Sequence, residues 1–182
     1  MTLRSEVARG ARQLDVELTS GVSVCFRYRL LMRFKEVIDT TAAPAAAFPF
    51  LSDFNNLPAW DPTIVRVEQL TAGPISVKTR LRVTLRFLGV ESALDYRVEE
   101  YEPNHRAVLV GTAATVTTTD TVLVEPRRGG CRVTWDADIR FAGPLRILDP
   151  LFAWLFASSV HSAITNLRRE LDKLPRRQSA AT

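Results

Sequence analysis

Residues 131–174 read CRVTWDADIRFAGPLRILDPLFAWLFASSVHSAITNLRRELDKL, and the hydrophobic period changes within them. Up to Phe141, apolar and polar residues alternate, which is typical of a strand with one buried face. Asp149-Pro150 then supplies a capping carboxylate and a proline suited to the first helical position. From there apolar residues recur every three or four positions, from Phe152 to Leu174. This spacing predicts a long amphipathic helix from about 150 to 174.

The residues before this segment predict an antiparallel sheet. A strand is expected over 33–42, then a short helix from Pro44 to about Ser52, bent at Pro49, and a second short helix or turn over 53–60. Six alternating segments follow, approximately 63–71, 77–88, 90–102, 106–113, 115–125 and 131–141. Their short links and the absence of crossover helices favour an antiparallel meander. A sheet of seven strands curls, so the long helix is expected to bury its apolar stripe on the concave face, in an α+β fold.

Composition fixes the class of molecule and excludes several functions. The chain has 182 residues, of which 46% are hydrophobic and 24% charged, as in a single globular domain. Two cysteines and two histidines are too few for a disulfide scaffold, a structural zinc site or histidine-rich metal chemistry. No phosphate-binding glycine loop, Gly-x-Ser-x-Gly or His-Glu-x-x-His motif occurs, so no cofactor or metal is expected. The net charge of +4 is interpreted as a solubility charge, and no nucleic-acid partner is expected.

Three parts are predicted along the chain. Residues 1–32 form an N-terminal extension with a helix over 3–18 and a strand that begins at Val22. Residues 33–174 form the main domain, and 175–182 are a polar tail. The first twelve residues are too polar for a secretory signal, and the longest uncharged run, 150–167, is too polar for a membrane span. We therefore expect no integral membrane segment, a cytoplasmic location and reduced thiols.

One carboxylate falls on the inward face that the alternation defines. Asp120 shares that face with Val116, Thr118 and Val122. Because burying an ionised carboxylate is costly, Asp120 must have partners or a raised pKa. It is interpreted either as a polar anchor or acid in a ligand cavity, or as a group near a strand end that Thr118, the backbone or water satisfies. Tyr96 also faces inward, and its hydroxyl needs a partner if it is buried.

His161 lies on a helix stripe that flanks the apolar one. It is interpreted either as a cavity donor or general base, or as a histidine at the rim whose ring packs against its neighbours. Large apolar side chains complete the predicted wall. The predicted ligand-binding residues are Trp60, Val83, Leu94, Tyr96, Asp120, Trp135, Phe152, Phe156 and His161.

Four segments together resemble one family. Residues 50–62, FLSDFNNLPAWDP, resemble a segment of the polyketide cyclase/dehydrase and lipid-transport family of the START-like (SRPBCC) superfamily, and 94–103, 120–126 and 143–150 are similar to it in the same order. The likeness covers about residues 33–174. It implies a helix-grip (START/Bet v 1-like) fold with a deep apolar cavity for lipids, polyketides, sterols or similar molecules, usually without metal or nucleotide. Trp60 and Asp120 fall at recurrent positions of the family.

Three functional hypotheses follow. The first is a cytoplasmic carrier or sensor that binds one lipid- or polyketide-like molecule, oriented by Tyr96, Asp120 and His161. The second is a cyclase or dehydratase that uses Asp120 or His161 as acid or base, although few titratable groups share the inner face. The third is a protein-interaction or regulatory module, which includes a homodimer, formed through the N-terminal helix or the start of the long helix around Leu151, Trp154 and Leu155.

Overall fold

A computed structural model describes residues 29–142 and 150–176, and gives only the backbone of 29–31, 142 and 150–157. The predicted helix over 3–18 and most of the polar tail lie outside these ranges. The elements, in chain order, are β1 (Arg29–Thr40), α1 (Pro44–Ser52), the 3-10 helix η1 (Phe54–Ala59), β2 (Ile64–Gln69), β3 (Arg80–Phe87), β4 (Val90–Glu102), β5 (Arg106–Thr112), β6 (Val116–Arg127), β7 (Gly130–Ala142) and α2 (Pro150–Lys173). These bounds confirm the predicted α+β order of elements.

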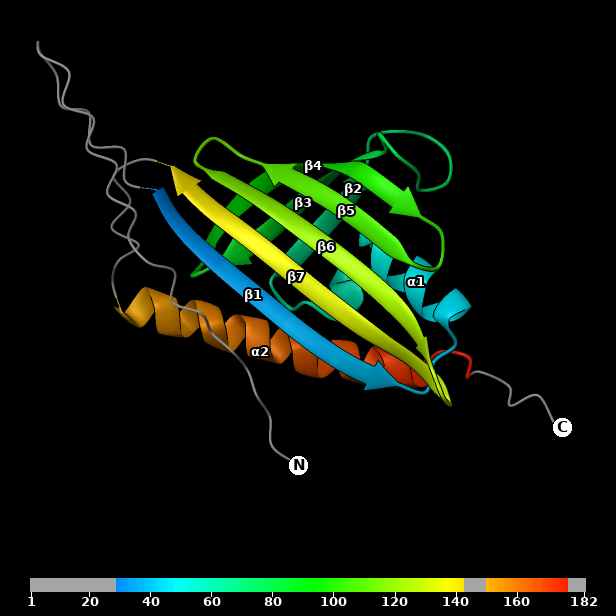
Figure 1. The fold of residues 1–182 in the computed structure, drawn as a ribbon. Coiled ribbons are helices and arrows are strands. Elements are labelled where there is room, and N and C mark those ends of the chain that lie inside the picture. Colours follow the sequence, from blue (N-terminus) through cyan, green and yellow to red (C-terminus); the bar gives the residue numbers. More distant parts are fainter. Residues whose placement is uncertain (1–28, 143–149, 177–182) are drawn as a thin grey trace, which may run out of the picture.

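The seven strands form one antiparallel sheet in the order β1-β7-β6-β5-β4-β3-β2. β2 to β7 make the predicted meander, while β1 pairs with β7 and so lies at the far edge from β2. The sheet is curved, α1 lies on the same side of it as α2, and α2 runs beside β1 (Figure 1). This is the expected arrangement, with the long helix on the concave side.

The short helices follow directly from the sequence between β1 and β2. Pro44 occupies the first turn of α1, and Asp53 ends that helix and caps η1, because its Oδ1 accepts the backbone N–H of Asn55 at 3.0 Å. Asp61 then ends the segment by accepting the backbone N–H of Thr63 at 2.9 Å. These caps fix η1 so that Phe54 and Trp60 are buried.

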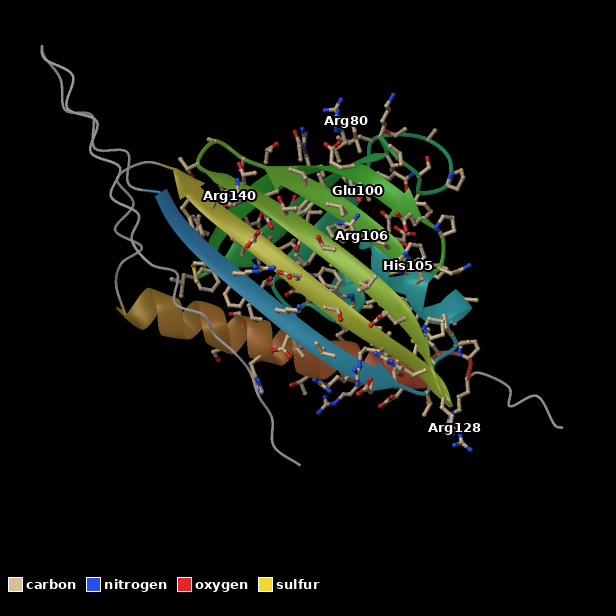
Figure 2. All side chains as sticks on the ribbon, viewed as in Figure 1. Arg80, Glu100, His105, Arg106, Arg128 and Arg140 are labelled. Atoms are coloured by element: carbon tan, nitrogen blue, oxygen red, sulfur yellow. The ribbon has the colours of Figure 1, made fainter. Side chains whose placement is uncertain are left out.

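The two faces of the sheet differ as the alternation predicted. The outer face carries ion pairs between neighbouring strands, among them Arg33–Asp136 at 2.7 Å and Arg82–Asp95 at 2.7 Å. Figure 2 shows the labelled Arg80, Arg106 and Arg140 on the strands. The inner face carries the core. Because charged residues occupy much of the outer face, the helices pack against the apolar residues of the inner face.

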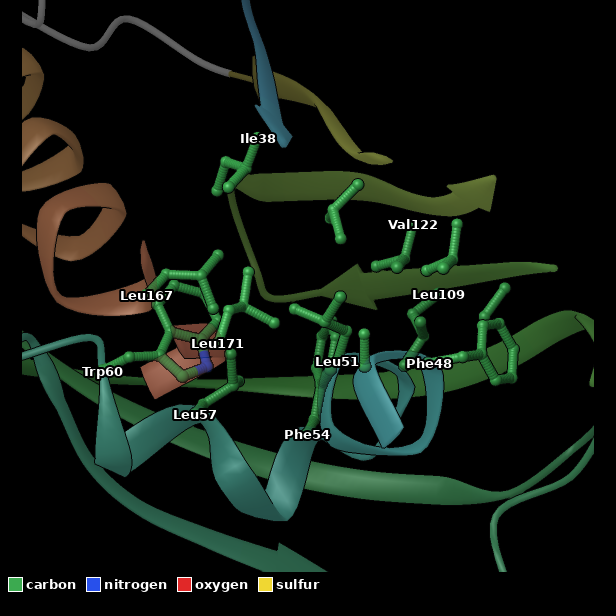
Figure 3. Packing of buried hydrophobic residues seen from close by; sticks show 14 of the residues in the cluster. Ile38, Phe48, Leu51, Phe54, Leu57, Trp60, Leu109, Val122, Leu167 and Leu171 are labelled. Carbon is green, nitrogen blue, oxygen red and sulfur yellow. The ribbon is translucent and has the colours of Figure 1, made fainter. Parts of the chain in front are cut away.

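The core fills the end of the concave face under the C-terminal half of α2. Leu167 and Leu171 of α2 are fully buried, and Figure 3 shows them among Trp60, Phe54 and Ile38. The remaining labelled members of the cluster are Phe48, Leu51, Leu57, Leu109 and Val122. Burial of this apolar surface is the main force that holds the helix on the sheet.

Polar contacts fix the position of α2 along β1. The Arg168 guanidinium lies 4.0 Å from the Glu36 carboxylate, and the Thr40 hydroxyl donates to Asp172 at 3.4 Å. Asn166 donates to the carbonyl oxygen of Trp60 at 3.2 Å, which ties α2 to the end of η1.

Within the described ranges, none of the helices has the length and apolar character that crossing a bilayer requires.

Replacing Leu167 with alanine tests the packing of α2. Because Leu167 is fully buried, Leu167→Ala is expected to lower the free energy of unfolding by about 2–5 kcal/mol. Ser162→Ala, at an exposed position of the same helix, is expected to change it by less than about 0.5 kcal/mol. Urea denaturation of both variants measures the difference, and equal effects would contradict this packing.

Candidate functional site

The carboxylate of Asp120 is the centre of a polar cluster on the inner face. Its Oδ2 accepts the hydroxyls of Thr118 at 3.0 Å and Tyr96 at 3.2 Å, and its Oδ1 accepts the indole N–H of Trp135 at 3.3 Å. Asp120 is 7% exposed and lies within β6, away from the strand ends. The structure therefore confirms that the carboxylate and the Tyr96 hydroxyl have partners, Thr118 among them.

A glycine makes this cluster possible. Tyr96 lies on β4 and Asp120 on β6, so the Tyr96 ring has to cross β5, where Gly111 pairs with Tyr96 on one side and Thr118 on the other. A Cβ atom at Gly111 would lie 2.6 Å from Cζ of Tyr96 and 2.8 Å from Cγ2 of Thr118. Gly111 was not among the predicted site residues, although a glycine at an inward position of a strand is a signal for close approach.

Four aromatic rings pack beside the carboxylate. Phe54 meets Tyr96 edge to face at 5.0 Å between ring centroids and stacks on Trp135 at 5.9 Å. Trp60 contacts Trp135 edge to face at 5.2 Å. The aromatic cluster holds the indole and the phenol in place, so their polar atoms stay directed at Asp120. Trp135 was predicted only as an apolar wall residue, and the structure shows that it is also a hydrogen-bond donor.

Burial shifts the titration of these groups. It raises the pKa of Asp120 to about 6, against the opposing effect of the hydrogen bonds from Thr118, Trp135 and Tyr96. Burial, together with the charge of Asp120, raises the pKa of Tyr96 well above its usual value, so its hydroxyl remains a donor. Burial also raises the pKa of Asp61, whose charge acts on Tyr96. Asp61 was not among the predicted site residues, because its position near Tyr96 depends on the path of η1.

The other predicted site residues occupy different surroundings. Val83 and Leu94 are buried and lie opposite each other in β3 and β4. His161 is exposed on α2, and among the described residues no hydrogen bond joins its ring to the Asp120 cluster. The structure therefore does not bring His161 together with Asp120. Phe152 and Phe156 lie in the backbone-only part of α2, so their place in the wall stays a prediction.

Asp120 lies where the packing of the inner face changes. On the side of α1 and the C-terminal half of α2, Val122, Val124 and Val133 are fully buried. Toward the other end, four inward residues of the strands, Leu85, Phe87, Val116 and Ile139, are only half-buried, although Phe141 opposite Val116 is buried. A surface hollow of about 400 Å³ among Asp39, Arg128, Arg132 and Asp172 lies away from this cluster and is lined by both charges. The half-buried apolar residues are the candidate ligand-contacting wall.

Comparison with known proteins agrees with this geometry. Residues 32–172 match the model of the family described as polyketide cyclase / dehydrase and lipid transport. The chain belongs to this family. The matched range contains all of the strands and helices except the first three residues of β1 and the last residue of α2, so the predicted START-like resemblance is confirmed.

Relatives and solved structures are similar over most of the domain. An uncharacterized protein of Mycobacterium tuberculosis is 27% identical over 145 residues, which are 76% of this chain and 84% of that protein. A START superfamily protein from Mycobacterium smegmatis superposes with a TM-score of 0.61 at 15% identity, over 79% of this chain and 99% of that one. TTHA0849 from Thermus thermophilus gives 0.62 at 17% identity, over 78% and 96%. At such identities the structures show the helix-grip fold alone.

Gly111→Ala tests the crossing of Tyr96 over β5. Alanine usually stabilises a strand relative to glycine, but here its Cβ would overlap the Tyr96 ring, so we expect a loss of about 1–3 kcal/mol in the free energy of unfolding. In a Tyr96→Leu background, most of that loss is expected to disappear. Chemical denaturation of the four proteins of this cycle measures the coupling, and equal losses in both backgrounds would exclude it.

Asp120→Asn tests the burial of the carboxylate. The folded-state pKa of about 6 lies above the ordinary value of 3.8, so the folded state holds its proton more tightly. The stability that this tighter proton binding contributes is complete below about pH 4 and is lost as the pH rises through 6. The shift corresponds to roughly 3 kcal/mol.

Between pH 4 and 7.5, the free energy of unfolding of the unaltered protein is therefore expected to fall relative to that of Asp120→Asn as the pH rises. Because Asp61 is present in both proteins, the difference between them isolates Asp120. A difference that does not change with pH would show that Asp120 titrates normally.

Proposed function

We propose that this protein binds a lipid- or polyketide-like small molecule between the sheet and α2, as a carrier or sensor in the cytoplasm. The observation that carries the proposal is the Asp120 cluster, a buried carboxylate that accepts three hydrogen bonds on a mostly apolar face. Binding sites for small molecules are mostly apolar, with a few convergent polar groups that fix the orientation of the ligand. The membership of the chain in a family of cyclases and lipid-transport proteins supports the same function.

The uneven packing of the inner face supports this location. The core seals the end beneath Leu167, whereas Leu85, Phe87 and Val116 keep part of their surface accessible at the other end. Burial of a ligand against these residues would contribute roughly 25 cal/mol per Å² of apolar surface before ordering costs are counted. The proposed ligand thus lies with its apolar part along these side chains and its polar end at Asp120.

A cavity-filling substitution tests the proposed function. Val116 is half-buried on the inner face, at the end where the packing is less complete, and Thr117 is its exposed neighbour on the outer face of β6. Val116→Trp is expected to weaken binding of the apolar dye Nile red at least tenfold, because the indole would occupy the ligand space, whereas Thr117→Trp is expected to leave it unchanged. Fluorescence titration measures both affinities. Equal Nile red binding by the two variants would refute this location. Separately, native mass spectrometry of the purified protein would reveal a ligand that copurifies.

The pKa of Asp120, about 6, favours one second candidate, a cyclase or dehydratase that uses Asp120 as an acid or base. A carrier is expected to leave the spontaneous cyclisation of a poly-β-keto thioester unchanged. If the protein accelerates it, and Asp120→Asn abolishes the acceleration while His161→Ala does not, the enzyme replaces the carrier. Product formation followed by chromatography distinguishes the two.

A further inference from the structure

The hydrogen bonds of Asp120 leave one acceptor position unused. A carboxylate oxygen accepts about two hydrogen bonds. Oδ2 already accepts two, from Thr118 and Tyr96, whereas Oδ1 accepts one, from Trp135. An additional partner at Oδ1 has to be a hydrogen-bond donor, because an acceptor would place its lone pair against the lone pair of Oδ1.

The described strands and short helices direct no basic side chain to the inner face. Every arginine and lysine of the seven described strands lies at an outward register position, and α1 and η1 contain no charged residue. Among the described residues of the strands and of the turn after η1, the charged groups on the inner side are the carboxyls of Asp61, Asp120 and Glu36. Arg168 of α2 is paired with Glu36. The field on a bound polar end is therefore negative above the pKa of Asp120.

Neighbouring donors do not serve a ligand in place of Asp120. The Thr118 and Tyr96 hydroxyls and the Trp135 indole all donate to the carboxylate. A ligand carboxylate at this position would have to displace one of them and would lie against Asp120 of the same sign. A ligand hydroxyl, in contrast, completes the set of hydrogen bonds without breaking any.

We propose, on the basis of the ligand-binding function proposed above, that Asp120 selects ligands whose polar end is a hydroxyl donor and rejects those that end in an anionic group. The site thus accepts an alcohol or phenol on an apolar body and excludes fatty acids and phosphorylated lipids. A group that only accepts hydrogen bonds, such as an ether, is disfavoured as well, because it leaves Oδ1 unpartnered.

Three probes of one chain length test this specificity. They are 1-decanol, its isomer 1-methoxynonane, which has no donor, and 1-decanesulfonate, which is anionic at every pH used. Displacement of Nile red from the full-length protein at pH 8 measures their affinities. Decanol is expected to bind at least tenfold more tightly than either of the others. The ether is the more hydrophobic of the two isomers, so apolar burial alone would reverse this order.

Asp120→Asn and pH provide two independent readouts. The variant is expected to bind decanesulfonate more tightly and so reduce the preference for decanol, whereas the matched control Asp95→Asn, on the outer face, is expected to leave it unchanged. At pH 5, where Asp120 is mostly protonated and Asp61 with its raised pKa is less charged, rejection of the sulfonate is expected to weaken in the unaltered protein, which needs no variant to fold.

The outcomes separate this inference from the proposed function. If the three probes displace Nile red equally, or the sulfonate binds best, the head-group selection is wrong while ligand binding stands. If Nile red and all three probes fail to bind, the proposed function fails, and the selection with it. A preference for decanol that is the same in Asp120→Asn and at pH 5 would assign the selection to groups other than Asp120.

Discussion

The sheet can bury only one of its faces, and this constraint determines the rest of the structure. Side chains alternate between the faces, so charged residues that pair outside, such as Arg82 with Asp95, leave their apolar neighbours for the inside. Exposed pairs of this kind contribute little stability each. The stability comes from the inner face, where α1, η1 and the C-terminal half of α2 cover it. Against this background Asp120 is an exception that must be explained.

The periodicity of the sequence was sufficient to predict the order of elements, the two faces and the place of Asp120. These follow from local rules, since a two-residue period defines a strand and a change of period defines the helix. Strand ends were harder to predict. The segment expected to begin at residue 77 becomes β3 only at Arg80, because Lys78 adopts a φ of 73°. A positive φ is uncommon for lysine, so the residue type did not predict this conformation.

The partners across strands could not be predicted, because they depend on register. Gly111 lies between Tyr96 and Thr118 only through the pairing of β5 with β4 and β6. The alternation placed Trp135 on the inner face, but it could not show that its indole N–H reaches a carboxylate. Asp61 approaches Tyr96 because Asp53 and Thr63 fix the turn at either end of η1. Periodicity thus identifies the face of a residue, and long-range packing decides which residues meet there.

The charge of Asp120 exceeds what the fold requires of it. Three buried donors need an acceptor, and the neutral carbonyl oxygen of an amide side chain could supply one without an ionised group. Replacing buried charges with uncharged groups is often neutral or stabilising. What a carboxylate adds is a negative field among buried aromatic and apolar side chains and a protonation state that changes near pH 6. Apolar burial attracts hydrophobic molecules without much discrimination between them, so in the proposed site the buried carboxylate of Asp120 is the feature that would distinguish one polar end of a ligand from another.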